Sequence, residues 1–135
     1  MRFMIIVRAT PETEAEGNPL PEDETVLPAM LAYHDELARA GVLLEGNGLK
    51  PSRHGWRIRY PGDGRRQVID GPFAETKELI AGYTLIQVRS REEAMAWARR
   101  FPAPLGEKVP AEIEVRELYE DSDFPPPPAA PAAAG

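Results

Sequence analysis

The chain has 135 residues, a length that suits one domain with a single hydrophobic core. Its 16 Lys and Arg against 22 Asp and Glu give a formal net charge of −6, which argues against nucleic acid or an anionic membrane as the main partner. The absence of cysteine excludes disulfides and Cys-ligated metals and favours a cytoplasmic location. No apolar run of about 18 residues occurs, so no transmembrane helix is predicted.

Two unlike segments open the chain. Residues 3–7 are apolar and mostly β-branched, which predicts a buried strand. Residues 11–24 combine three prolines and a glycine with six acidic residues. This composition predicts a mobile acidic loop that connects the strand to the next element.

A helix is predicted from Thr25, at the N-cap, to about Ala40. A proline at its third position costs no intrahelical hydrogen bond, and Gly41 fits the C′ position that ends a helix. Residues at i, i+3, i+4 and i+7 spacing predict one apolar stripe that faces the core. The members of this stripe are Leu27, Met30, Leu31, His34, Leu37 and Ala38.

The middle of the chain predicts a short strand and a hairpin. The strand covers residues 42–44, and the glycines at 46 and 48 should break it. Residues 56–60 alternate with period 2, and after a Pro-Gly-Asp-Gly turn residues 65–69 return as the second strand. The alternation places Trp56, Ile58 and Tyr60 on one face, and Arg57 and Arg59 on the other.

The last third predicts a strand, a helix and a final strand. The strands cover residues 82–88 and 112–116. A capping box at residues 90–93 opens the helix, which runs through Phe101. Its inner face is predicted to contain Ala94, Trp97, Ala98 and Phe101. Residues 120–135 form a tail rich in Pro and Ala that is predicted to be disordered.

The order β-α-β-(β-hairpin)-β-α-β predicts an α+β domain over residues 1–119. We expect a ferredoxin-like arrangement, an antiparallel sheet with two helices on one face. The other face of the sheet would then be uncovered. Self-association is the simplest way to cover it, so a homodimer or a higher oligomer is predicted.

The segment from Asp70 to Glu78, Asp-Gly-Pro-Phe-Ala-Glu-Thr-Lys-Glu, resembles the signature of the DGPF-domain proteins of the YCII-related family. The resemblance covers residues 1–118 and implies a dimeric α+β barrel with an active site built from a His-Asp pair. A relative in the wider family is similar to a dehydrochlorinase that acts on a chlorinated hydroxyquinone. Supporting motifs occur in the same order as in the family, at residues 33–37, 40–43, 45–49, 82–86 and 93–98.

His34 is the first candidate for chemistry. A histidine on an apolar stripe is usually a core residue with satisfied hydrogen bonds. The competing interpretation is catalysis, because an imidazole can act as acid or base near neutral pH. The family resemblance favours this second interpretation.

Asp70 is the candidate partner of His34, because a carboxylate can fix the tautomer of an imidazole and stabilise its charged form. The alternative is an Asx-type turn, in which the carboxylate bonds to its own backbone. The neighbouring Asp35 points away from His34 on the helix and is expected to be a solvated surface residue.

Four further residues are candidates for binding a substrate. Phe73 and Tyr83 could form the walls of an aromatic-sized pocket, although both residue types are more often part of a core. Arg57 and Arg59 could bind an anionic substrate, although solvated strand residues are the simpler interpretation. His54 is expected to be exposed in a loop.

No cofactor and no metal are predicted. The chain has only two histidines and no His-x-x-x-His or His-Glu-x-x-His spacing. The Gly46-Asn47-Gly48 segment lacks the third glycine and the following helix of a nucleotide-binding loop. No nucleophile elbow accompanies a Ser-His-Asp set.

Three hypotheses for function remain open. The first is a cofactor-independent enzyme that uses His34 and Asp70 for proton transfer, such as elimination or isomerisation, on a small cyclic or aromatic compound. The second is a non-catalytic dimer that binds a small ligand or a partner protein in a regulatory role. The third is a stable dimer whose pocket is vestigial.

Overall fold

A four-stranded antiparallel sheet forms the centre of the computed structural model, which describes residues 1–15 and 20–128. The strands lie in the order β2-β5-β1-β6, so the two central strands, β5 and β1, are far apart in the sequence. Their bounds are β1 Arg2–Arg8, β2 Leu43–Gly48, β5 Ile80–Gln87 and β6 Ile113–Glu117.

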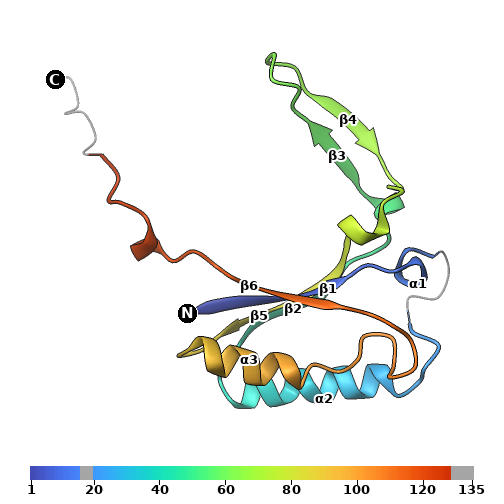
Figure 1. Cartoon of the computed structure of the whole chain (residues 1–135), viewed down its shortest axis with the longest axis vertical. Helices are drawn as coiled ribbons and strands as arrows, with labels where there is room; N and C mark the ends of the chain where they lie inside the picture. Colours follow the sequence, from blue (N-terminus) through green and yellow to red (C-terminus); the bar gives the residue numbers. More distant parts are fainter. Residues whose placement is uncertain (16–19, 129–135) are drawn as a thin grey trace.

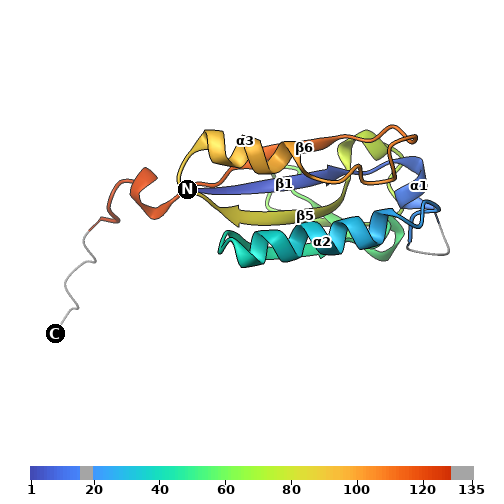
Figure 2. The ribbon, with the colours of Figure 1, turned by 90° about the horizontal axis from the view of Figure 1, so that it is seen from below.

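Two helices, α2 (Val26–Arg39) and α3 (Arg91–Arg99), cover one face of this sheet (Figure 1 and Figure 2). The predicted α+β, ferredoxin-like arrangement is therefore confirmed. Strand β6 ends in a chain segment that leaves the sheet and runs out toward the C-terminus. Among the described residues, no helix is long and apolar enough to cross a membrane.

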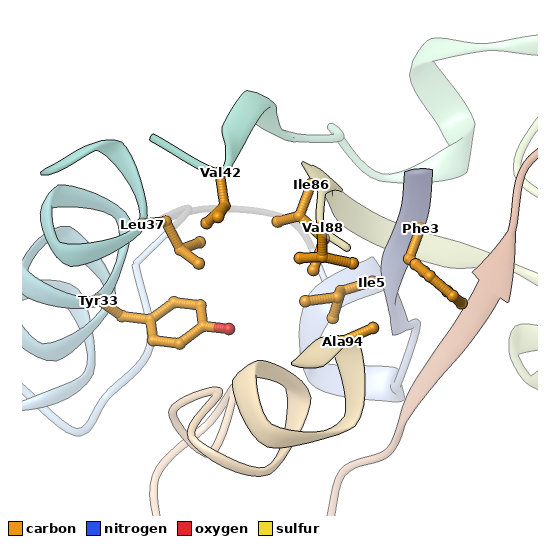
Figure 3. Packing of buried hydrophobic residues seen from close by; sticks show 8 residues of the cluster. All are labelled: Phe3, Ile5, Tyr33, Leu37, Val42, Ile86, Val88 and Ala94. Carbon is orange, nitrogen blue, oxygen red and sulfur yellow. The ribbon is translucent and has the colours of Figure 1, made fainter. Parts of the chain in front are cut away.

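The core lies between the helices and the sheet, where side chains of both layers interdigitate (Figure 3). Ile5, Leu37 and Ile86 are fully buried, and burial of each such side chain stabilises the fold by about 1.5–3 kcal/mol. The whole cluster consists of Phe3, Ile5, Tyr33, Leu37, Val42, Ile86, Val88 and Ala94.

Helix α2 is rotated relative to the predicted stripe. Its buried residues are Val26, Tyr33 and Leu37, whereas Leu27 and Leu31 are exposed. The predicted stripe is confirmed at Leu37, is half-buried at Met30 and His34, and was wrong at the remaining positions. The error arises because apolar side chains occur around more than half of this helix. Two neighbouring stripes therefore fit the same spacing, and only the contact with the sheet selects one.

The two main helices begin at the predicted residues, but one of the two predicted side-chain caps does not form. Thr25 is at the N-cap of α2, but its side chain makes no capping bond to the helix and donates instead to Asp23. Ser90 caps α3 by accepting a bond from the backbone N–H of Glu93, as predicted. Gly41 follows α2 with φ of 75°, the conformation expected at C′.

Strand β2 is longer than predicted. The glycines at 46 and 48 do not break it, because Gly46 pairs with Thr84 and Gly48 pairs with Gly82 on β5. Glycine weakens a strand by itself, but pairing along β5 supplies the backbone hydrogen bonds that keep the segment extended.

The predicted hairpin forms a separate two-stranded sheet of β3 (Trp56–Arg59) and β4 (Gln67–Asp70). Trp56 pairs with Asp70, and Ile58 pairs with Val68. The hairpin extends away from the four-stranded sheet on the side opposite the helices (Figure 1). Its alternation of apolar and basic residues agrees with the prediction.

Short helical turns flank the sheets. Helix α1 (Pro11–Glu14), capped by Thr10, occupies the start of the predicted acidic loop, whose residues 16–19 lie outside the described residues. The turns η1 (Ser52–His54) and η2 (Thr76–Glu78) lie on either side of the hairpin, and η3 (Asp121–Asp123) begins the predicted tail. The last part of that tail, residues 129–135, also lies outside the described residues.

Candidate functional site

His34 is a residue of α2 that contacts β5, and both of its ring nitrogens are hydrogen-bonded. Nδ1 is 2.8 Å from the carbonyl oxygen of Met30, one helical turn earlier, and Nε2 is 2.8 Å from Oγ1 of Thr84. A carbonyl oxygen can only accept, so Nδ1 must carry a proton. In the neutral ring, Nε2 therefore has the lone pair and accepts the hydroxyl hydrogen of Thr84.

Thr84 is the partner that sequence reasoning missed. Its side chain is only 2% exposed, and it points from β5 toward the helices. A buried hydroxyl without a partner costs about 1–3 kcal/mol, so the bond with His34 stabilises this contact between helix and sheet. Fifty residues separate the two, and no local pattern in the sequence indicates their pairing.

Gly46 leaves the space that the imidazole ring occupies. A Cβ atom at this position would lie 3.0 Å from Cδ2 and 3.1 Å from Nε2 of His34. A side chain at position 46 would therefore require the ring to shift by at least a few tenths of an ångström. Position 46 thus helps to place the imidazole.

Two aromatic rings lie close to that of His34. The ring centroids of Tyr33 and Phe101 lie 5.7 and 6.4 Å from that of His34, both in edge-on geometry. The hydroxyl of Tyr33 donates to the carbonyl oxygen of Trp97 at 2.7 Å. Burial raises the pKa of Tyr33 to about 12, so this phenol keeps its proton at physiological pH.

Asp70 ends strand β4 and is exposed. Among the described residues, no hydrogen bond or ion pair involves its carboxylate, so the alternative of an Asx-type turn is not formed. The structure also records no contact between Asp70 and His34, whose ring nitrogens have Met30 and Thr84 as partners. The His34–Asp70 pair stays a prediction.

The turn after Asp70 is packed against η1. A Cβ atom on Gly71 would overlap the carbonyl oxygen of Ser52, so only glycine fits there. The backbone N–H of Phe73 donates to Oγ of Ser52 at 3.0 Å, and that hydroxyl donates to the carboxylate of Glu14. Glu14 also accepts from the backbone N–H of Ser52 at 2.9 Å.

These contacts show that Glu14 and Ser52 hold the turn, a role that the sequence did not suggest for either. They connect α1, which belongs to the predicted acidic loop, to the Asp-Gly-Pro-Phe segment. The turn that carries Asp70 therefore has a fixed backbone, whereas its carboxylate has no partner among the residues that the structure describes.

The predicted binding residues divide between two places. The guanidinium of Arg57 lies 3.9 Å from the ring centroid of Phe73, so these two residues are together at the base of the hairpin. Arg59 is exposed further along β3. Tyr83 is on the face of the main sheet that lacks helices, where its hydroxyl donates to Glu45 at 2.8 Å.

Asn47 completes a small polar group with Tyr83 and Glu45. Its side-chain amide donates to Glu45 at 2.9 Å and to the hydroxyl of Tyr83 at 3.1 Å. His54 is exposed in η1, and Asp35 forms an exposed ion pair with Arg39, both as predicted. Within the described ranges, no three His, Asp or Glu side chains gather as metal ligands would.

Comparison with known proteins gives a consistent result. The model of the YCII-related domain matches residues 1–119. An uncharacterised protein from Rhizobium meliloti (strain 1021) is 33% identical over 104 residues, which are 77% of this chain and 83% of that protein. The match begins at the first strand and ends just after β6, so it covers the sheet, both helices and the hairpin.

Proposed function

Because this chain belongs to the YCII-related domain family, we propose that it is a small enzyme that transfers a proton on a cyclic or aromatic compound without a cofactor. His34 is the acid or base in this proposal. The observation that carries it is the single tautomer of the ring, in which the bond from Nδ1 to Met30 leaves the lone pair on Nε2. A base of defined orientation is the first requirement of proton transfer.

The narrower form of the proposal pairs His34 with Asp70. In it, Asp70 would stabilise the imidazolium that forms when His34 accepts a proton. Support comes from the free carboxylate of Asp70 and from its place on a turn whose backbone Ser52 and Glu14 fix. For direct contact, the ring would have to exchange one of its two present partners.

Four residues would bind the substrate. Arg57 and Phe73 already lie in contact, and together they offer a cation and an aromatic surface at the base of the hairpin. Arg59 lies two residues further along the same strand and would attract an anionic group. Tyr83 is on the face of the sheet opposite to the one where Thr84 bonds to His34, so its role as a wall of the same pocket stays a prediction.

The homodimer is also part of the proposal. Met4, Ile6, Tyr83 and Leu85 lie side by side on the uncovered face of the sheet and are only half-buried. A second copy placed against this face would remove their apolar surface from water. A cytoplasmic location fits a chain that contains no cysteine.

Exchange of substrate protons with solvent tests the enzymatic proposal without knowledge of the natural reaction. The full chain would be incubated in D2O with a panel of cyclic ketones, lactones and hydroxyquinones, and loss of C–H signals would be followed by NMR. We expect the wild type to catalyse exchange on at least one compound. His34→Gln should lower that rate by about 10²–10⁴-fold, the usual contribution of a general acid or base.

Asp35→Asn is the matched control, because it changes a charge next to His34 on the exposed side of the same helix. It should leave the exchange rate unchanged. Asp70→Asn tests the narrower form, which requires a loss similar to that of His34→Gln. Equal exchange by the wild type and His34→Gln would refute the role of His34.

A non-catalytic, ligand-binding dimer is the second candidate. The observation in its favour is that both ring nitrogens of His34 already have partners, as expected of a structural histidine. In that case a compound from the panel would raise the melting temperature without any proton exchange.

A further inference from the structure

We propose that the β3–β4 hairpin is an arm whose apolar face is covered by a second copy of this chain. The arm comprises residues 53–70, and its apolar face consists of Trp56, Ile58, Val68 and Asp70. These four share one face because directly paired residues of an antiparallel hairpin point to the same side. The proposal rests on the homodimer described above and adds the element that joins the copies.

The exposure of this face is the first argument. Trp56 is 64% exposed, Ile58 is 44% exposed and Val68 is 67% exposed. A two-stranded hairpin by itself is at best marginally stable in water, and contiguous apolar patches of this kind mark interaction surfaces. The apolar face therefore needs a cover that the described part of one chain does not supply.

The opposite face of the arm makes contacts within its own chain. There, Arg57 lies against the ring of Phe73, and Ile69 is half-buried. The base of the arm is also fixed, because Gly71 donates to the carbonyl oxygen of Gly55 at 3.0 Å and packs against Ser52. The arm is thus attached to its own subunit through one face and presents the other to a partner.

The charge of the arm agrees with a second copy as the occupant. The arm contains five arginines and two aspartates, so its formal charge is +3, whereas the rest of the chain has 11 basic and 20 acidic residues, or −9. These arginines lie on the opposite face of the arm, in its turn and at its base, so they do not line the apolar face. Their charge instead favours the approach of an acidic body, and another copy of this chain is one.

The direction of the arm agrees with this assignment. It extends on the side of the main sheet that carries no helices, which is also the side of Met4, Ile6, Tyr83 and Leu85 (Figure 1). A copy placed on that face would meet the arm as well. The two surfaces would then form one continuous interface.

Asp70 gains a role from this arrangement. It shares the apolar face with Trp56, its direct pairing partner, so the second copy would enclose its carboxylate. A site that includes Asp70 would therefore lie between two copies and be incomplete in one chain.

The test compares two neighbouring substitutions in the full-length chain. Val68→Asp places a carboxylate on the apolar face, and Gln67→Asp places the same charge on the opposite face. Both positions are exposed, so both variants should fold, as circular dichroism would verify. In sedimentation velocity, Val68→Asp should raise the dimer dissociation constant by about tenfold or more, whereas Gln67→Asp should leave it close to the wild-type value.

Tryptophan emission follows the arm directly. In a Trp97→Phe background, Trp56 is the only tryptophan. Its emission should shift to shorter wavelength as the protein concentration passes through the dissociation constant. The same concentration series with His34→Gln should give the same shift of Trp56 emission. The contact made by the arm is thereby tested independently of the catalytic role of His34.

Three results would overturn the proposal. A wild type that is monomeric at every concentration would remove both the homodimer and the arm contact. A dimer in which Trp56 keeps a fully solvated emission, or in which both charge variants dissociate equally, would remove the arm contact alone. Binding of a short DNA duplex at low salt that is lost in Val68→Asp, with no change in dimerisation, would assign the face to nucleic acid instead.

Discussion

The four-stranded sheet and the β3–β4 hairpin differ in sequence pattern and in what covers them. In β1 and β5, apolar residues occupy both faces of the strands, and two helices bury one of these faces. In β3, apolar and basic residues alternate, and the apolar side chains of Trp56 and Ile58 stay in solvent. The comparison teaches that alternation predicts which residues share a face, but it does not predict what covers that face.

The largest expected difference concerns isoleucine in the two regions. Ile5 of β1 is fully buried, whereas Ile58 of β3 is 44% exposed. Ile5→Ala should lower the free energy of unfolding by about 2–5 kcal/mol, because it leaves a cavity between sheet and helices. Ile58→Ala should cost less than about 1 kcal/mol. Urea unfolding of both variants at low protein concentration makes the comparison, and equal losses would contradict it.

The second largest expected difference concerns how stability depends on pH through a buried tyrosine of the core and an exposed tyrosine of the hairpin. The pKa of Tyr33 is raised from 10.0 to about 12, mainly by burial, so above pH 10 the unfolded chain loses this proton first. Stability from Tyr33 is complete below pH 10 and declines toward pH 12 by about 2–3 kcal/mol.

Tyr33→Phe removes that ionisation. Its free energy of unfolding should therefore decline less than that of the wild type between pH 10 and pH 12. Tyr60→Phe, in the exposed turn of the hairpin, is the matched control and should decline as the wild type does. Parallel profiles for the wild type and Tyr33→Phe would show that burial of the phenol has no such effect.

The smallest expected effect lies within β2, the strand that leads toward the hairpin. Gly46→Ala should lower stability by about 1–3 kcal/mol, because the new Cβ crowds the ring of His34. Gly48→Ala meets no atom within 4 Å and should change stability by less than about 1 kcal/mol in either direction. Chemical denaturation measures both, and an NMR spectrum of the His34 ring would report its displacement only in the first.

Local patterns explain why much of the fold could be predicted. Ser90 and Glu93 indicate the start of α3, and the alternation of Trp56 and Arg57 indicates two faces of a strand. Both signals depend on residues that are close in sequence. The Thr10-Pro11 pair was a further signal of this kind, typical of a helix start, and it would have predicted α1.

The misses depend on partners that are distant in sequence. The buried face of α2 is selected by the sheet, so spacing alone could not choose Tyr33 over Leu31. Thr84 could not be identified as the partner of His34, because their contact depends on how α2 packs on β5. Asp70 illustrates the same difficulty, because no pattern states whether a carboxylate at a strand end has a partner within its own chain.

The close approach of Gly46 to the imidazole has an evolutionary consequence. Positions 34 and 46 are coupled, because a Cβ atom at 46 requires the ring at 34 to shift by a few tenths of an ångström. A lineage that kept His34 would be under pressure to keep glycine at 46, whereas one that had lost the imidazole would acquire alanine there without this crowding. The residue at 46 in a related sequence therefore indicates whether that relative has kept the room that an imidazole needs.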